Sequence, residues 1–373
     1  MLKLKELCFE IISNCYLNCI YCSSFDDVIR KRDNRYLPFS LIKKVINDFY
    51  MLGGEVLELS GGEPLMHPQI FDIVDYALNK GIDVIVYTSG VLPDSYNIKD
   101  VLNKLQKIGL KKIVFNCQGL SKVHESLVRR EGAFTKLIHA IECSKEIDLW
   151  IGVHFVLNKQ NYFQLEEVHN FLNQLGVDEL ALLRLVKQGR AKQNWNMLEI
   201  EGSNYIKFFR DVYMLARTKS SPTIRVGCPF DFMNILYPDW AEVHDCHAGR
   251  SSLDIMANGD IFPCPAFKDV AVAKLGNIFN DPLEKVWRES VFLKKLRNII
   301  PSQITFCNEC NFLNSCKGRC TAQRILENGS LFKGPDPLCK KMYLYRKKEE
   351  KISQLRCNNF LTVKKDNAFL SLI

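Results

Sequence analysis

The sequence predicts an α/β protein in which a partial (β/α)6 barrel is followed by a small cysteine-rich domain. The first observation is an alternation, from Glu6 to about Leu215, of short β-branched runs with longer helical patterns. Repeated β-then-α units of this kind indicate a parallel sheet. The second observation is that the chain has six such units, too few to close a (β/α)8 barrel. The third is a rise in cysteine, glycine and proline after about residue 217.

The six predicted units each consist of a strand and the helix that follows it. The expected strands are Glu6–Ile12, Glu55–Ser60, Asp83–Thr88, Lys112–Cys117, Leu149–Leu157 and Glu179–Leu185. The expected helices are Pro38–Leu52, Pro68–Lys80, Ile98–Ile108, Ala133–Lys145, Tyr162–Leu175 and Asn204–Ala216. Because parallel strands end at the same edge of a sheet, we expect the active site at their carboxyl ends.

Three segments are expected along the 373 residues: the barrel over 1–216, the cysteine-rich domain over 217–350 and a tail over 351–373. In the second domain the clearest helices are Pro282–Ser290 and Phe292–Ile299. We expect metal, rather than a large apolar core, to organise this domain.

Composition and charge exclude several classes of protein. The formal charge of +8, from 50 basic and 42 acidic residues, is too mild to indicate nucleic-acid binding. No stretch approaches the roughly 18 apolar residues of a membrane span, and no signal peptide precedes the first strand. We therefore expect a cytoplasmic protein with no membrane partner. In that reducing compartment the 15 cysteines indicate metal binding or catalysis rather than disulfides.

Three cysteines follow the first predicted strand with the spacing C-x3-C-x2-C: Cys15, Cys19 and Cys22. One loop thus offers three thiolates, enough for three irons of a [4Fe–4S] cube, and leaves the fourth iron open to a substrate or cofactor. The alternatives are a zinc site, which usually pairs two C-x2-C motifs, or three unrelated thiols.

This loop resembles the signature of the radical S-adenosylmethionine (SAM) superfamily, whose fold is a partial (β/α)6 barrel. The resemblance implies that the open iron binds the amino and carboxylate groups of SAM. It also implies reductive cleavage of SAM to a 5′-deoxyadenosyl radical, with electrons from an external low-potential donor such as flavodoxin or ferredoxin.

Further motifs match the family's SAM site. Gly61, Gly62 and Glu63 form a GGEP motif after the second strand, where glycines permit close approach of the backbone to a ligand. The resemblance implies that they bind the SAM amino group, and that Tyr21 lies against the adenine. It also implies SAM contacts from Ser89, at the tip of the third strand, and from Arg184, near the SAM carboxylate.

Seven cysteines in the second domain form a longer array: Cys246, Cys264, Cys307, Cys310, Cys316, Cys320 and Cys339. The array resembles the SPASM domain at every spacing, whereas a zinc ribbon would account for only four of the thiols. The resemblance implies two auxiliary [4Fe–4S] clusters, and hence three clusters in all. It assigns Cys307, Cys310, Cys316 and Cys339 to an outer cluster and Cys246, Cys264 and Cys320 to an inner one. Cys228 is our candidate for the fourth inner ligand, and an open iron is the alternative.

SPASM enzymes mostly modify peptides, so we expect oxidative modification of a peptide by crosslinking or dehydrogenation. A small molecule such as a tetrapyrrole is the alternative substrate. Sulfatase maturation is less expected because Pro265 stands where those enzymes carry an aspartate base. Only fourteen residues precede Cys15, so we expect a peptide substrate either to be delivered by a separate leader-binding protein or to bind the enzyme directly. An electron-transfer protein without SAM chemistry would not need Gly61, Gly62 and Glu63, and no catalytic acid or base is identified.

Overall fold

The fold is described from a computed structural model that defines residues 2–24, 36–218, 221–227, 236–237, 246–311 and 313–339. The candidate ligand Cys228 and the predicted tail lie outside these described residues. Throughout the described segments, no helix combines the length and apolar composition that crossing a bilayer requires.

The six predicted barrel strands are present, and each bound lies within one residue of its predicted position. They are β1 (Glu6–Ile12), β2 (Val56–Gly61), β3 (Asp83–Thr88), β4 (Lys112–Asn116), β5 (Trp150–Leu157) and β6 (Glu179–Arg184). Each pairs in parallel with the next, in sequence order. The predicted partial barrel is thus confirmed.

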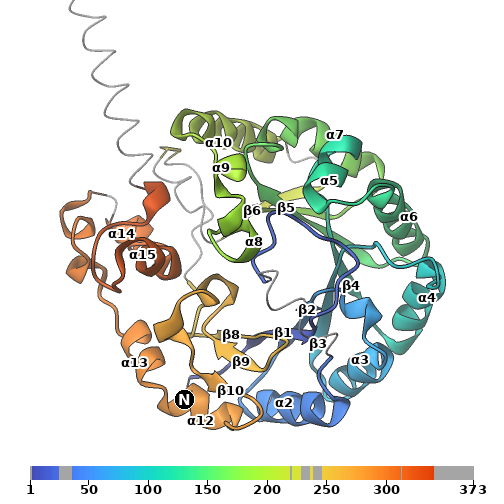
Figure 1. The fold of residues 1–373 in the computed structure, drawn as a ribbon, viewed down its shortest axis with the longest axis horizontal. Helices are drawn as coiled ribbons and strands as arrows, with labels where there is room; N and C mark the ends of the chain where they lie inside the picture. Colours follow the sequence, from blue (N-terminus) through green and yellow to red (C-terminus); the bar gives the residue numbers. More distant parts are fainter. Residues whose placement is uncertain are drawn as a thin grey trace, which may run out of the picture.

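The helices of the six units pack around the outside of this curved sheet (Figure 1). They are α2 (Phe39–Met51), α3 (Ile70–Leu78), α4 (Ile98–Ile108), α6 (Ala133–Glu146), α7 (Leu165–Gln174) and α10 (Gly202–Arg217). Side-chain alternation explains their placement, because Leu7, Phe9 and Ile11 of β1 are fully buried on the face opposite Cys8 and Glu10. Among the described residues of the barrel segment, three further short helices were not predicted: α5 (Ser121–Val128), α8 (Gly189–Gln193) and α9 (Trp195–Leu198).

The sheet continues across the predicted domain boundary at both of its edges. Strand β7 (Thr223–Val226) pairs in parallel with β6, and β8 (Ser252–Ile255) pairs in parallel with β1. Strands β9 (Asp260–Phe262) and β10 (Gly276–Asn277) then extend the β8 edge in antiparallel fashion, which makes a sheet of ten strands. The cysteine-rich segment is therefore built onto the barrel sheet, and a domain division near residue 216 stays a prediction.

An apolar core joins the two parts of the chain, whereas we expected metal, rather than a large apolar core, to organise the second. Leu253, Ile255 and Trp287 are almost completely buried in one cluster with residues of β1 and α2. The indole of Trp287 also donates to the carbonyl of Leu2 over 3.0 Å. The second part further contributes α12 (Leu283–Glu289), α13 (Val291–Arg297), α14 (Leu313–Cys316) and α15 (Thr321–Asn328).

Candidate functional site

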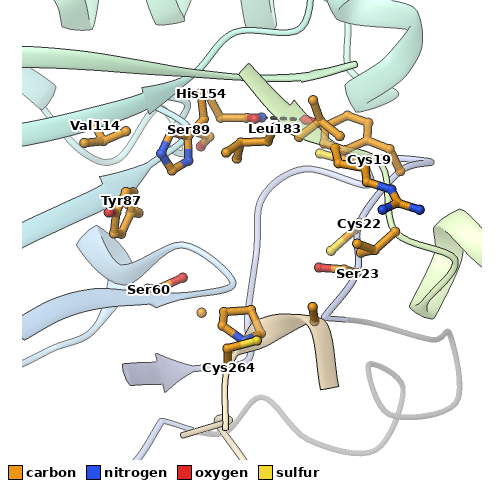
Figure 2. Close-up of a pocket in the computed structure, with 18 of the residues that line it drawn as sticks. Cys19, Cys22, Ser23, Ser60, Tyr87, Ser89, Val114, His154, Leu183 and Cys264 are labelled. Carbon is orange, nitrogen blue, oxygen red and sulfur yellow. Dashed lines mark hydrogen bonds between the residues drawn. The ribbon is translucent and has the colours of Figure 1, made fainter. Parts of the chain in front are cut away.

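A pocket of about 560 Å³ lies at the carboxyl ends of the barrel strands, and residues of the cysteine-rich segment line its other side. Six predicted cluster ligands line it: Cys15, Cys19, Cys22, Cys246, Cys264 and Cys320. Figure 2 shows Cys264 entering from the second segment, across the pocket from Cys19 and Cys22. The two cysteine arrays, more than 200 residues apart in sequence, thus share one pocket.

The first cysteine loop is anchored to the unpredicted helix α5. The amides of Asn18 and Ile20 donate to the carbonyls of Val128 and Leu127 over 3.1 and 2.9 Å. Leu17 and Ile20 are buried beneath the loop, at 2% and 3% exposure. The loop is therefore fixed by packing and backbone hydrogen bonds, leaving its thiols at the pocket.

Ten of the described thiols fall into three groups. In each group burial, and with it the charge of a neighbouring thiol, raises the pKa of at least one member: Cys15 and Cys19 in the first, Cys264 in the second, and Cys307 and Cys339 in the third. The groups are Cys15, Cys19 and Cys22; Cys246, Cys264 and Cys320; and Cys307, Cys310, Cys316 and Cys339. Among the described residues, no three His, Cys, Asp or Glu side chains surround a single metal ion. A four-iron cube spaces its thiolates more widely than one tetrahedral ion does, and the assignment of the three groups to clusters stays a prediction.

We expect these raised pKa values to make the metal-free protein sensitive to alkali. The pKa is raised to about 11 for Cys307 and to about 12 for Cys320 and Cys339, against 9.0 for an ordinary thiol. The unfolded chain therefore loses these protons first, so stability is intact below pH 9 and falls as the pH rises towards 12.

Urea unfolding midpoints measured between pH 8 and 11 would check this expectation. The iron-loaded protein is the control, because its ligating thiolates have already lost their protons and the decline should be smaller. A midpoint in the metal-free protein that stays flat or rises with pH would contradict the burial of these thiols.

Gly61 and Gly62 fit the tip of β2 against the cysteine loop. Gly61 has a φ of 134°, and a Cβ there would lie 2.3 Å from the carbonyl oxygen of Ile12. A Cβ on Gly62 would lie 2.0 Å from the carbonyl oxygen of Asn14. The amides of Gly62 and Glu63 donate to these same carbonyls over 2.7 and 2.8 Å. These two hydrogen bonds hold the start of the cysteine loop against the motif. Both glycines also line the pocket.

Glu63 is completely buried and holds the tip of β3. Its carboxylate accepts from the hydroxyl of Thr88 over 2.6 Å, and from the amide and hydroxyl of Ser89 over 2.9 and 2.5 Å. The amide of Leu65 donates to it over 3.3 Å. Burial raises the pKa of Glu63, and these hydrogen bonds oppose the shift. Thr88 and Ser89 line the pocket whereas Glu63 lies behind them, which the sequence motif did not reveal.

Replacing Glu63 with alanine should therefore weaken SAM binding by displacing Ser89 and Thr88. Four donors would lose their acceptor, and each buried unsatisfied group costs about 1–3 kcal/mol. We expect SAM affinity to fall at least about tenfold, in line with about 1.4 kcal/mol, while the iron content is retained. Equilibrium dialysis with SAM would measure this. The exposed Glu55→Ala is the matched control, and unchanged SAM affinity in Glu63→Ala would contradict the role of Glu63.

Tyr21 lines the pocket and belongs to a polar chain that crosses the barrel. Its hydroxyl accepts from the side-chain amide of Asn116 over 2.5 Å, and Asn116 in turn accepts from Gln118 over 2.5 Å. Gln118 also accepts from the amide of Val156 over 2.8 Å. These amides fix Tyr21 relative to β4 and β5.

Arg184 lines the pocket, as expected, but its guanidinium is engaged. It donates to the carboxylate of Asp336 over 2.7 Å, and the two side chains are 6% and 2% exposed. Arg190 also lines the pocket and donates to the carbonyl of Cys19 over 2.8 Å. The sequence alone did not reveal Asp336 as a partner, because it lies 152 residues away.

A buried charge cluster beside the first cysteine loop also escaped prediction. Lys268, which follows Cys264 by four residues, forms an ion pair with Glu10 of β1 and lies 3.7 Å from Asp254 of β8. Its ammonium donates to the hydroxyl of Ser24 over 3.1 Å. Burial raises the pKa of Asp254 to about 7, against the opposing charge of Lys268. No local pattern distinguishes this lysine from a surface residue.

His154 of β5 faces the pocket with Tyr87 (Figure 2). The two rings lie 4.9 Å apart, and the hydroxyl of Tyr87 donates to Glu58 over 2.8 Å. Burial, with a contribution from the charge of Arg225, lowers the pKa of His154 to about 3. This imidazole is therefore neutral at physiological pH.

Family comparisons agree with this geometry. Residues 9–172 match the radical SAM superfamily, and residues 246–311 match the SPASM iron–sulfur cluster-binding domain. The chain therefore carries a radical SAM domain followed by a SPASM domain, and it is a SAM-dependent iron–sulfur enzyme. Its cofactors are SAM, a [4Fe–4S] cluster that binds SAM, and auxiliary iron–sulfur clusters.

Individual relatives resemble the chain over most of its length. AdoMet-dependent heme synthase of Methanosarcina barkeri is 22% identical, covering 90% of this chain and 96% of the relative. Mycofactocin maturase MftC of Mycolicibacterium smegmatis is 27% identical, covering 89% of this chain and 82% of the relative. Streptococcus suis SuiB bound to S-adenosylmethionine shares the fold, with a TM-score of 0.72 at 20% identity, covering 91% of this chain and 77% of SuiB. SuiB bound to its precursor peptide SuiA has the same TM-score and identity.

Proposed function

We propose that this enzyme oxidatively modifies a peptide, forming a crosslink or a dehydrogenated product. The observation that carries the proposal is the shared pocket, which two of the three thiol groups line. A substrate bound there would lie between the site of radical formation and an electron acceptor. The similarity to a mycofactocin maturase and to SuiB, which has been solved with a precursor peptide, supports a peptide substrate.

In this proposal each thiol group holds one [4Fe–4S] cluster. The SAM-binding cluster is assigned to Cys15, Cys19 and Cys22, the inner auxiliary cluster to Cys246, Cys264, Cys320 and Cys228, and the outer one to Cys307, Cys310, Cys316 and Cys339. Direct SAM contacts are assigned to Tyr21, Gly61, Gly62 and Ser89, with Glu63 acting through Ser89. Arg184 is not carried forward as the partner of the SAM carboxylate, because Asp336 holds its guanidinium.

When bound, these groups supply a 5′-deoxyadenosyl radical that removes a substrate hydrogen atom and a cluster that accepts the electron of the substrate radical. The protein must keep that radical away from water. Val114, Phe115 and Val156 of the barrel wall provide apolar lining, and the segment from Cys264 to Ala266 covers the opposite side. The neutral imidazole of His154 adds no charge to this wall.

A tetrapyrrole or other small molecule is the second candidate substrate. The observation that favours it is the similarity to an AdoMet-dependent heme synthase over 90% of this chain. Sulfatase maturation is not proposed, since Pro265 lines the pocket in the slot that the aspartate base would occupy.

Anaerobic assays with both substrate classes would test the proposal. The reconstituted enzyme, SAM and dithionite would be incubated with precursor peptides encoded beside the gene, or with iron-containing tetrapyrroles. We expect 5′-deoxyadenosine and a peptide that has lost one pair of hydrogens, both detected by mass spectrometry. Turnover of the tetrapyrrole with unaltered peptides would overturn the peptide assignment in favour of the second candidate.

We also infer that a low-potential protein such as flavodoxin or ferredoxin supplies the electrons in the cell, and that the enzyme works in the cytoplasm. The 15 cysteines support a reducing compartment, because oxidised thiols could not bind iron.

A further inference from the structure

The ion pair between Arg184 and Asp336 joins the barrel to the last described cysteine. Arg184 ends β6, and Asp336 lies between two prolines, three residues before Cys339. The second oxygen of Asp336 accepts from the amide of Leu338 over 2.8 Å, which fixes the chain as it enters Cys339. Arg184 therefore positions the Cys339 segment on the barrel through Asp336.

This pair is far more buried than most ion pairs in the described residues. Its side chains are 6% and 2% exposed, whereas those of Lys99 and Glu146 are 52% and 57% exposed. Removing one partner from a buried pair leaves an uncompensated charge and is strongly destabilising, whereas replacing both partners together is often tolerated. A pair of apolar side chains at positions 184 and 336 would be enough to stabilise the fold. The two charges therefore call for a role other than stability.

The pair connects thiols of both groups assigned to the auxiliary clusters. Arg184 lines the pocket together with Cys320 of the inner group. Asp336 lies three residues before Cys339 of the outer group, in the segment that its own carboxylate holds. One partner of the buried pair thus shares the pocket with an inner thiol, and the other precedes an outer thiol in the chain.

We propose that Arg184 and Asp336 are positioning residues that seat the Cys339 segment and set the reduction potentials of the auxiliary clusters in opposite directions. This inference rests on the proposed ligand assignment. Net charge near a cluster is one of the factors that set its potential. A cluster gains negative charge when reduced, so the carboxylate opposes reduction and the guanidinium favours it. Burial strengthens both effects, because the surroundings screen charge poorly.

Single and double variants would test this proposal in a chain that lacks the SAM-binding cluster, made by Cys15→Ala, Cys19→Ala and Cys22→Ala. Redox titrations followed by electron paramagnetic resonance would then report the auxiliary clusters alone. We expect Asp336→Asn to raise their potentials and Arg184→Gln to lower them. The double variant, which keeps a neutral hydrogen-bonding pair, should return close to the parent. Glu146→Gln, in an exposed ion pair, is the control and should shift nothing.

Shifts of the same sign in both single variants, or no shift with iron content retained, would overturn the proposal. If the unpaired charge makes a single variant lose its iron–sulfur clusters, the iron content of the double variant decides. An iron content in the double variant close to that of the parent supports the positioning role. An iron content as low as in the single variants overturns it. The ligand assignment fails separately: in that case the parent lacking the first three cysteines would itself hold no clusters.

Discussion

Cys15→Ala should abolish 5′-deoxyadenosine formation while leaving the auxiliary clusters in place. The loop offers only three thiolates to its cluster, and removing one leaves two, too few to hold a cube with one open iron. We expect iron content to fall from about twelve to about eight per chain, at four irons per cluster. Iron counting and chromatography of the SAM products would measure both effects.

The control for this variant is Cys143→Ala, which removes a thiol of α6 that is 3% exposed and outside the three groups. It should keep both its iron and its SAM cleavage. Continued 5′-deoxyadenosine production by Cys15→Ala would contradict the assignment of the opening loop as the SAM-binding site.

Lys268→Met should destabilise the protein by roughly 3–5 kcal/mol, the usual cost of breaking a buried ion pair from one side. Methionine fills a similar volume but leaves Glu10 and Asp254, which are 2% and 0% exposed, without their cation. The loss should be smaller at pH 5 than at pH 8, because protonation removes the uncompensated charge. Urea unfolding at the two pH values would measure it.

Lys274→Met is the matched control, since Lys274 lies 2.7 Å from Asp260 but its side chain is 48% exposed. A pair of that exposure contributes about 0–1 kcal/mol. Equal destabilisation by the two variants, or a larger loss for Lys268→Met at the lower pH, would contradict the buried charge cluster.

Local patterns predicted the parts of this molecule that depend on neighbours in sequence. The strands β1 to β6 follow from β-branched runs, and the cysteine groups follow from spacing within loops. Helix α5 was missed because its eight residues are too short for a clear helical period. The pairing of β8 with β1 could not be predicted, since it joins segments about 240 residues apart that carry no shared local signal.

The roles of single charged residues were least accessible from sequence. The GGEP motif predicted that Glu63 binds SAM. Only the four hydrogen bonds that its carboxylate accepts show that it supports the end of β3. Arg184 was placed near SAM by its position at the end of β6, but its guanidinium forms an ion pair with Asp336, far along the chain. Burial decides such roles, and burial depends on the whole fold.

The position of β1 has a consequence for how the protein is made. This strand leads directly into the first cysteine loop, and it lies between β2 and β8 rather than at an edge. During synthesis one side of β1 stays open until residues 252–255 have left the ribosome. An open strand edge can pair with other chains. The newly made chain therefore carries its first cluster loop beside an aggregation-prone edge until residues 252–255 have been translated.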